Sequence, residues 1–272
     1  MELQKHFVAF IDILGFTKYV MDNALSPDKP LEFLKKFIDI PKKFQKPIQN
    51  LKVTIFSDNI IASMLTKENS QPPDYELKIW DFITYVNYLQ LYITTSLRIL
   101  PIRGGVTYGD FYHDGSDLLF GEAMIEAYDL ERLHAFFPRI VVKSKFLDPI
   151  KYLSAHERFS SIESSLVKFP NYEPDKLLRH YPVKYDFDGV LFCNYLSALY
   201  LATSNMWSRY SEDALNKHKE FILENLQNSE DLNVSRKYIW MKNYHNWFCE
   251  PYEEFQKFII PDEIIIRGNT ND

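Results

Sequence analysis

Residues 7–20 of this 272-residue chain read FVAFIDILGFTKYV. The first five are apolar, as in a buried β-strand, and Asp12 interrupts the apolar run shortly before Gly15. A charge inside an apolar strand is costly unless something compensates it, although an Asp at a strand end also commonly caps a turn. The stretch therefore predicts a core strand over residues 6–13 that ends in an acidic group, which is either functional or a turn cap.

A second carboxylate interrupts the next β-rich stretch, LKVTIFSDNIIASML at residues 51–65. The triplet SDN, which contains Asp58, predicts a hairpin turn, and SDN is also an ordinary turn composition. If the first strand lies beside this hairpin, Asp12 and Asp58 converge, and a divalent cation between them relieves their repulsion. Mg²⁺ and Mn²⁺ both accept one or two carboxylates together with substrate phosphates.

The residues after Asp12 offer a contact for phosphate. Gly15 permits a turn whose backbone N–H groups face an anion. The alternative is a helix that starts here with Thr17 as its N-cap, and both descriptions can hold at once.

The rest of the chain predicts an α/β sandwich with a mostly antiparallel sheet and helices on one face, in the ferredoxin-like, palm-type arrangement. The supporting elements are helices at 26–44 and 75–100, a strand–turn–strand–helix unit at 101–136 and a strand at 138–146. We expect residues 1–150 to form this core. We expect residues 151–272, with helical patterns at 212–228 and 234–258, to form a mostly helical C-terminal elaboration packed on it.

Composition narrows the class of protein. The chain is 46% hydrophobic with a net charge of −6 and has no long run of like charges. This argues against a nucleic-acid duplex as partner, but not against a single nucleotide. Its two cysteines give neither a disulfide framework nor a zinc spacing. With no signal peptide and no membrane-length apolar run, we expect a cytoplasmic protein without a membrane partner.

Four blocks of the sequence resemble those of a known protein family. FIDILGFT, FSDN, RGGVTYGD and FGEAMIEAYDLE, within residues 7–145, resemble in that order the signature blocks of class III nucleotidyl cyclases. They look most like the compact bacterial pyrimidine (uridylate and cytidylate) cyclases of Pycsar antiphage systems. The stretches DFDGVLFCNYL and WMKNYHNW are also typical of those enzymes.

The resemblance implies a class III cyclase domain that converts UTP, favoured over CTP, to the 3′,5′-cyclic monophosphate and diphosphate, as a second messenger in antiviral defence. Asp12 and Asp58 would hold two divalent ions, Mn²⁺ or Mg²⁺, with the Ile13 carbonyl as an added ligand. Gly15 and Phe16 would contact the triphosphate. The enzyme would be a homodimer with sites made from both subunits.

The sequence also departs from the family. Adenylate and guanylate cyclases of this class carry a transition-state Asn and Arg in the helix after the glycine block, and those places fall on Ile125 and Asp129. Arg103 is the candidate substitute, both catalytic and nucleotide-binding. An Arg paired to a structural carboxylate, Glu131 or Asp110, is an equally open interpretation. The weaker candidates are Arg132, Lys143 and Lys184.

Two other functions therefore stay open. One is a catalytically inactive cyclase-like module that binds a nucleotide and dimerises. The other is a diguanylate synthase, which is disfavoured because the hairpin reads SDN rather than GGDEF.

Other residues receive provisional roles. Three aromatic residues are candidates to narrow the base pocket to a single-ring base: Phe56, Tyr108 and Tyr112. His113 and His134 are expected on the surface, and Cys193 buried and inert. Asp186 and Asp188 are expected in a turn, with a third metal ligand as the alternative. Trp240, Tyr244 and Trp247 are expected in a core-facing helix stripe, with a base-stacking shelf as the alternative.

Overall fold

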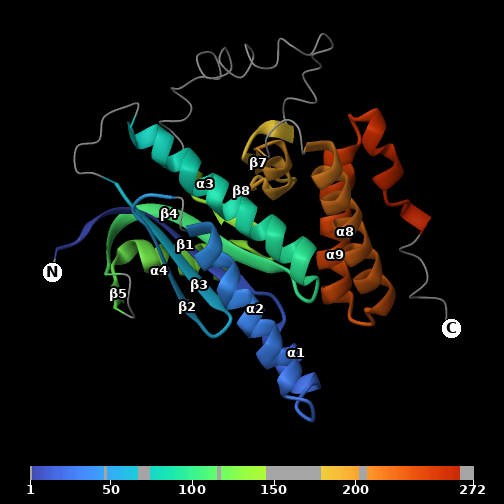
Figure 1. Ribbon diagram of the computed structural model, residues 1–272, viewed down its shortest axis with the longest axis horizontal. Helices are drawn as coiled ribbons and strands as arrows, with labels where there is room; N and C mark the ends of the chain where they lie inside the picture. The colour runs from blue at the N-terminus through green and yellow to red at the C-terminus, as the bar shows by residue number, and fades with distance from the viewer. Residues whose placement is uncertain are drawn as a thin grey trace, which may run out of the picture.

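One β-sheet organises the molecule, and strand β1 (Gln4–Ile13) lies inside it (Figure 1). The computed structural model describes residues 2–45, 48–66, 74–114, 118–144, 179–201 and 207–263. The other strands are β2 (Leu51–Phe56), β3 (Asn59–Leu65), β4 (Ile102–His113), β5 (Leu119–Phe120), β6 (Ile140–Val142), β7 (Val183–Tyr185) and β8 (Leu191–Cys193).

The strand order within these residues is β2-β3-β1-β4-β6-β8-β7, and the short β5 pairs with β4. All pairs are antiparallel except β4 with β6. The first four strands, taken with the helices between them, follow the ferredoxin-like βαββαβ order. This confirms the predicted mixed, mostly antiparallel fold. The segment predicted as a helical elaboration supplies β7 and β8 to the same sheet.

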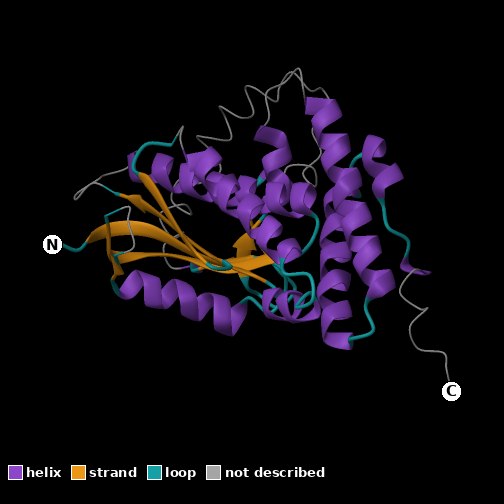
Figure 2. Ribbon diagram, turned by 60° about the horizontal axis from the view of Figure 1, so that its bottom comes forward, coloured by secondary structure: helices purple, strands orange, loops and turns teal. Residues whose placement is uncertain are grey.

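Helices cover both faces of the sheet, so the prediction of helices on one face is wrong (Figure 2). Side chains alternate along β1: Phe7, Ala9 and Ile11 pack in a core with α2 (Asp28–Gln45) and α3 (Asp74–Tyr92). Val8 and Phe10 pack on the other side with α4 (Glu122–His134). The physical reason is that β1 is apolar on both faces, and each face must be buried.

Glycine lets α4 approach the sheet closely. A Cβ added at Gly105 of β4 would lie 2.2 Å from the Ala127 carbonyl oxygen and 2.6 Å from Leu130 Cβ. The inward face of α4 is itself made of small residues, since Ala123 and Ala127 are the ones buried against β1 and β4. Gly105, in the RGGVTYGD block, therefore has a packing role, because it allows the close approach of α4.

The helices predicted at 75–100 and 234–258 both end earlier than expected. The helix predicted at 75–100 ends as α3 at Tyr92 and continues as one π-turn, η1 (Ile93–Leu97), before Arg98 takes a left-handed φ of 51°. The helix predicted at 234–258 is α9 (Leu232–Cys249) followed by a separate 3₁₀ turn, η4 (Glu253–Phe258). Pro251, which lacks an amide hydrogen, follows the end of α9.

The C-terminal elements share a second core. It joins α8 (Trp207–Asn228), α9, η4 and the 3₁₀ segment η3 (Tyr195–Leu201), with Phe192 of β8. Trp240 and Tyr244 are buried in it, which confirms the predicted core-facing stripe. Cys193 is buried as expected, and burial raises the pKa of its thiol.

A chain of hydrogen bonds crosses this second core. Tyr195 Oη lies 2.7 Å from His218 Nε2, His218 Nδ1 lies 2.9 Å from His245 Nδ1, and His245 Nε2 lies 3.0 Å from the Phe258 carbonyl oxygen. Because that carbonyl can only accept, His245 Nε2 donates to it, and two neutral rings that each donate one bond and accept one complete the chain. Burial lowers the pKa of His218 well below its usual range and that of His245 to about 4.

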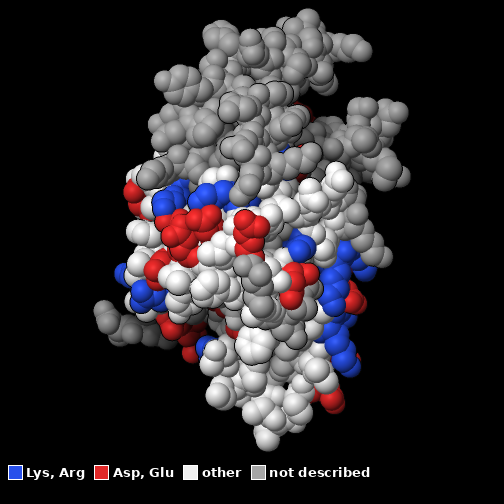
Figure 3. Space-filling model, turned by 90° about the vertical axis from the view of Figure 1, so that its left-hand side faces the viewer, with Lys and Arg blue, Asp and Glu red and all other residues white. Residues whose placement is uncertain are grey.

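Within the described residues, the helices are all too short or too polar to cross a lipid bilayer. On the face shown in Figure 3, the described Lys and Arg side chains are interspersed with Asp and Glu, and neither sign covers that face.

Candidate functional site

Asp12 is the penultimate residue of β1 and lies between two neighbouring strands. Its Cα is paired with Asn59 of β3 on one side and with Arg103 of β4 on the other. Its position in the strand alternation puts the side chain on the face that α4 covers. The side chain is 19% exposed, so the carboxylate reaches solvent only at the rim of the sheet.

Arg103 joins Asp12 to α4. Its Nε lies 3.3 Å from Asp12 Oδ2, and its Nη2 lies 2.7 Å from Glu131 Oε1. The Glu131 side chain is only 4% exposed, and within the described residues its Oε1 accepts no hydrogen bond of good geometry despite this short separation. The interpretation that pairs Arg103 with Glu131 is therefore confirmed. Pairing with Asp110 is wrong, because Asp110 forms its ion pair with Lys5 at 2.8 Å.

Asp58 occupies the β2–β3 turn, directly beside the end of β1. The Ile13 amide donates a hydrogen bond to the Asp58 carbonyl oxygen at 3.3 Å, which ties the two candidate segments together. The predicted hairpin next to the first strand is thus confirmed. Ser57, which precedes Asp58, has a left-handed φ of 54°, a conformation that normally favours glycine. Strain of this kind is held by the surrounding structure and occurs often at functional sites.

The electrostatics of the cluster favour added positive charge. Burial raises the pKa of Asp12 to about 6, while the Arg103 charge opposes the shift and the Glu131 and Asp58 charges add to it. Burial also raises the pKa of Glu131, again against the effect of Arg103. Asp12 and Glu131 thus share one guanidinium, and the Asp58 charge adds a third carboxylate close enough to act on Asp12. Such an imbalance raises the cost of keeping all three ionised.

The predicted phosphate turn is a helix start. Gly15 has a φ of 85° and is the N-cap of α1 (Phe16–Asp22), so the helix begins before Thr17 rather than after it. The side chains of Ile13 and Phe16 are buried in the core, and the Phe16 ring lies 6.3 Å from that of Phe33. Ile13 and Phe16 can therefore offer a ligand only their backbone groups.

Of the aromatic residues assigned to a base pocket, only Phe56 lies near Asp58. It is 75% exposed at the hairpin tip. Tyr108 packs on Phe7 with ring centroids 5.0 Å apart, on the α3 face of the sheet and away from Asp12. Tyr112 shares that alternation on β4. The roles of Tyr108 and Tyr112 in a base pocket are therefore wrong, because β4 turns them to the opposite face.

Ile125 and Asp129, the two positions at which the sequence departs from the class III cyclase pattern, lie on the outer part of α4. Ile125 is 65% exposed, and Asp129 lies 3.4 Å from Arg132 in an i,i+3 pair. Two of the weaker candidates for the transition-state cation have other partners. Lys143 pairs with Glu126, and Lys184 lies 4.6 Å from the centre of the Trp247 ring. Three strands separate β7, which carries Lys184, from β1, or about 19 Å at the usual strand spacing.

His113 is buried, so the prediction of a surface position is wrong. Its Nδ1 lies 2.7 Å from Ser63 Oγ and its Nε2 lies 2.9 Å from Thr54 Oγ1. Burial lowers the pKa of His113 to about 4, and a neutral ring satisfies both hydroxyl groups. His134 is exposed as expected.

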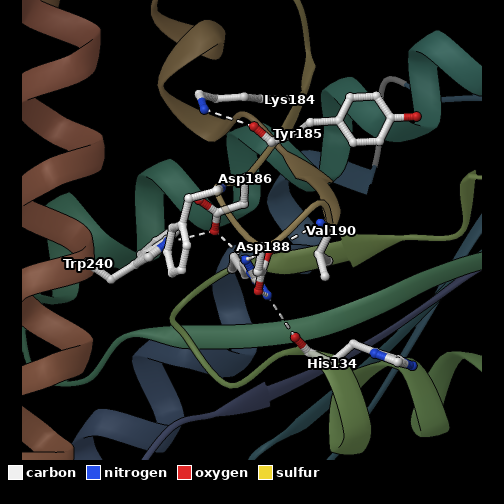
Figure 4. A network of polar contacts seen from close by, with 9 residues as sticks. His134, Lys184, Tyr185, Asp186, Asp188, Val190 and Trp240 are labelled. Atoms are coloured by element: carbon white, nitrogen blue, oxygen red, sulfur yellow. Dashed lines mark hydrogen bonds and ion pairs between the residues drawn. The ribbon is translucent and has the colours of Figure 1, made fainter.

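Asp186 and Asp188 lie in the β7–β8 turn and bind a buried arginine. Both carboxylates pair with Arg139, whose side chain is 1% exposed, and Trp240 Nε1 donates to Asp186 Oδ2 at 2.7 Å (Figure 4). Arg139 Nη2 also donates to the His134 carbonyl oxygen at 3.1 Å. The predicted turn is confirmed. These carboxylates compensate a buried charge, which leaves the alternative of a third metal ligand without support.

One cation whose charge acts on that of Arg103 was not predicted from the sequence. Lys237 of α9 is half-buried, and its pKa is lowered by burial and by the charge of Arg103. It lies in an ordinary helical stretch far along the chain, so no local pattern distinguishes it.

The donor set suits a hard divalent cation that also binds phosphate. No group of three or more His, Cys, Asp or Glu side chains within the described residues is placed to enclose a metal ion. Mg²⁺ seldom requires such an enclosure, since it is commonly bound by one or two carboxylates plus substrate phosphates. The surplus of carboxylates around Asp12 fits this partial type of site.

A cavity of about 560 Å³ lies elsewhere, between α2, β3 and α3. Its lining comprises Phe44, Ile48, Gln49, Asn50, Met64, Lys78, Asp81, Thr84, Tyr85 and Tyr88. Met64 belongs to the α2–α3 core, so this cavity is on the opposite face of the sheet from Asp12. The carboxylate cluster, not this cavity, holds the candidate chemistry.

The sequence matches no protein-family model and no curated protein. Among the solved structures that are similar in fold, three adenylyl or guanylyl cyclases each align with just over half of this chain. Adenylyl cyclase CyaB from P. aeruginosa has 17% identity over 56% of this chain and 83% of its own, with a TM-score of 0.43. A bacterial light-regulated adenylyl cyclase has 20% identity over 57% and 82%, with a TM-score of 0.38. Guanylyl cyclase Cya2 has 15% identity over 54% and 80%, with a TM-score of 0.35. These values describe a likeness of shape, and the functional argument rests on the residues of this chain.

Proposed function

We propose that this protein is a metal-dependent nucleotidyl cyclase that acts on a pyrimidine nucleoside triphosphate, UTP in preference to CTP. The observation that carries the proposal is the placement of Asp12 and Asp58 at the adjoining ends of β1 and the β2–β3 turn. The sequence blocks that resemble class III cyclases contain both residues. The cyclic nucleotide would serve as a cytoplasmic signal in antiviral defence.

In the proposed reaction the ribose 3′-hydroxyl attacks the α-phosphate, diphosphate leaves, and a 3′,5′-cyclic monophosphate forms. Two Mn²⁺ or Mg²⁺ ions, when bound, supply the positive charge that activates the hydroxyl and shields the phosphates. Asp12 and Asp58 would hold these ions, with the Ile13 carbonyl as a further ligand. The backbone of Gly15 and Phe16 would contact the triphosphate.

Arg103 has two tasks in this proposal. Before substrate binds, its guanidinium balances Asp12 and Glu131. When the triphosphate enters, the same group lies beside the reacting phosphates and stabilises the charge that develops there. Glu131 is the positioning residue, because its ion pair holds Arg103 at the end of β1.

A homodimer with shared sites remains part of the proposal. The outer surface of α4 and the residues that follow it expose four large apolar or aromatic side chains: Ile125, Tyr128, Leu133 and Phe136. Such a surface suits contact with a second copy, which would also place partner groups at the sheet end.

A second candidate function is an inactive cyclase-like nucleotide-binding and dimerisation module. It is favoured by Ile125 and Asp129, neither of which can donate to a phosphate in the transition state.

Turnover assays distinguish the two functions. The purified protein is incubated with each of the four nucleoside triphosphates and Mn²⁺, and the products are separated by chromatography. We expect one cyclic pyrimidine nucleotide, and we expect Asp58→Ala to abolish it. Absence of turnover of every triphosphate by the wild-type protein would reject the enzyme, whereas a cyclic purine product would reject only the pyrimidine preference.

A further inference from the structure

The cavity between α2, β3 and α3 has a volume of about 560 Å³, which is within the usual range of sites that hold small organic ligands. One side of it is a single stripe of α3. Lys78, Asp81, Tyr85 and Tyr88 line the cavity at spacings of three or four residues, so they lie on one face of the helix. The two charged residues come first along this stripe and the two tyrosines last. The cavity therefore has a charged end and an aromatic end.

The aromatic end is held by both helices. The Phe44 ring of α2 and the Tyr88 ring of α3 are inclined by only 18°, with centroids 6.4 Å apart. Tyr85 is buried, and its Oη donates to the Pro41 carbonyl oxygen of α2 at 3.4 Å. These rings present flat apolar surfaces in fixed positions, which suit a planar ring of a ligand.

Hydrogen bonds hold the third side of the cavity, which residues 48–50 form between α2 and β2. The Ile48 amide donates to the Gln45 carbonyl oxygen at 3.0 Å, and Gln45 Nε2 donates to the Leu51 carbonyl oxygen at 2.8 Å. The Leu65 amide donates to the carbonyl oxygen of Asn50, which has a left-handed φ of 63°. These bonds fix this side of the cavity before any ligand enters, which lowers the cost of binding.

The charged end presents a cation and an anion side by side. Within the described residues, the Lys78 Nζ donates one hydrogen bond, to the Leu65 carbonyl oxygen at the long distance of 3.5 Å, so two of its N–H groups remain available. Asp81 is exposed, and a carboxylate accepts several hydrogen bonds. A ligand with a single charge would be attracted by one of these side chains and repelled by the other, whereas a ligand with both charges satisfies both.

We propose that this cavity is a binding site for a small aromatic zwitterion, a molecule of the aromatic amino acid type. Its carboxylate accepts hydrogen bonds from Lys78, its ammonium group donates to Asp81, and its ring packs on Tyr85 and Tyr88. The site is separate from the carboxylate cluster, because Met64 in its wall lies about 17 Å along β3 from Asn59, the partner of Asp12. The inference is independent of the proposed cyclase activity.

The test uses the full chain in EDTA, without nucleotide, and three probes that share one ring system. L-tryptophan carries both charges, tryptamine lacks the carboxylate, and indole-3-propionate lacks the ammonium group. In calorimetric titrations we expect L-tryptophan to bind about tenfold or more tightly than either of the other two, because each of these loses one charge-assisted hydrogen bond.

Single substitutions assign each charge to its partner. Lys78→Met is expected to weaken tryptophan binding about tenfold and to bind tryptophan and tryptamine within about twofold of each other. Asp81→Asn is expected to do the same for tryptophan and indole-3-propionate. If Lys78→Met melts early, Lys78→Gln provides a second neutral variant. Thr84→Trp, which fills the cavity without a change of charge, is expected to abolish binding of all three probes.

Lys36→Met and Asp39→Asn are the matched controls. Lys36 and Asp39 have the same spacing on an exposed part of α2 and do not line the cavity, so both variants should bind tryptophan within about twofold of the wild type. The site would be rejected by wild-type protein that binds none of the probes, by equal affinity of the wild type for all three, or by tryptophan binding that survives Lys78→Met, Asp81→Asn and Thr84→Trp. Because no nucleotide or metal takes part, these results do not depend on the outcome of the cyclase assay.

Discussion

Arg103 and Asp12 are cross-strand partners on β4 and β1, and Arg103 Nε lies 3.3 Å from Asp12 Oδ2. The same guanidinium lies 2.7 Å from the buried Glu131. One cation therefore stabilises a carboxylate at the sheet end and another on the helix beneath it. Its removal affects both.

Replacement of Arg103 by methionine is expected to lower the cyclisation rate roughly tenfold or more, as for loss of one charge-stabilising donor. Since Arg103 opposes the upward shift of the Asp12 pKa, its loss raises that pKa further. The acidic limb of the pH–rate profile should then move to higher pH. A rate and profile equal to those of the wild type would exclude Arg103 from the site.

Asp12→Asn is expected to stabilise the metal-free protein at neutral pH but not in acid. The folded pKa of Asp12, about 6, is raised above the usual 3.8. Its contribution to stability is therefore complete below pH 3.8 and is lost as the pH rises through about 6. In EDTA, the advantage of Asp12→Asn over wild type should grow by on the order of 2–3 kcal/mol between pH 4 and pH 7.5, measured by urea unfolding.

Addition of Mn²⁺ at neutral pH should make the wild type more stable than Asp12→Asn. Mn²⁺ is expected to stabilise the wild type much more than Asp12→Asn, because the variant keeps only one of the two carboxylate ligands, Asp58. A stability difference that does not change with pH, or equal stabilisation of both proteins by Mn²⁺, would contradict the metal-binding role of Asp12.

Gly105→Ala is expected to destabilise the protein by about 1–3 kcal/mol through overpacking, because the new methyl group meets the Ala127 carbonyl at 2.2 Å. The displacement of α4 should also move Glu131 away from Arg103 and reduce activity. Gly189→Ala is the control, since no atom lies within 4 Å of its added Cβ and only its left-handed φ of 78° is penalised. Equal stability of the wild type and Gly105→Ala would show that α4 does not pack as described.

Acid is expected to weaken the second core through His218 and His245. Burial depresses both pKa values below the 6.5 of an unfolded histidine, so their stabilising contribution is present above pH 6.5 and is lost as the pH falls, in the case of His245 toward about 4. The loss from His245 should be on the order of 2 kcal/mol between pH 6.5 and pH 5. His245→Gln should flatten the slope of unfolding free energy against pH, while the exposed His134→Gln should leave it unchanged. An unchanged slope in His245→Gln would contradict the neutral hydrogen-bond chain.

The strands and most helices could be predicted because their apolar residues recur with clear periods. The exception is α4, because the spacing of its large apolar residues does not predict which face of the helix is buried. Its buried face is made of Ala123 and Ala127, while Ile125 and Leu133 point outward. Since the largest apolar residues are exposed, amphipathicity alone gives the wrong face. The apolar second face of the sheet requires a cover, and the small residue Gly105 allows the Ala face of α4 to provide it.

The candidate site was likewise predictable from the sequence only in part. The adjacency of the Asp12 and Asp58 segments follows from strand order, which the sequence does indicate. The pairing of Arg103 with Glu131 was one of two open alternatives, because a sequence does not fix which helical turn lies under a strand. Lys237 could not be found, since its position depends on how α9 is held by Trp240, Asp186 and Arg139.

The order of the strands has a consequence for synthesis on the ribosome. Strand β6 bonds on one side to β4 and on the other to β8, which emerges only some forty to fifty residues later. A nascent chain that has just released β6 therefore exposes an unpaired strand edge until residue 193 leaves the exit tunnel. Translational pauses in this interval would prolong that exposure, and chaperone dependence should be concentrated there.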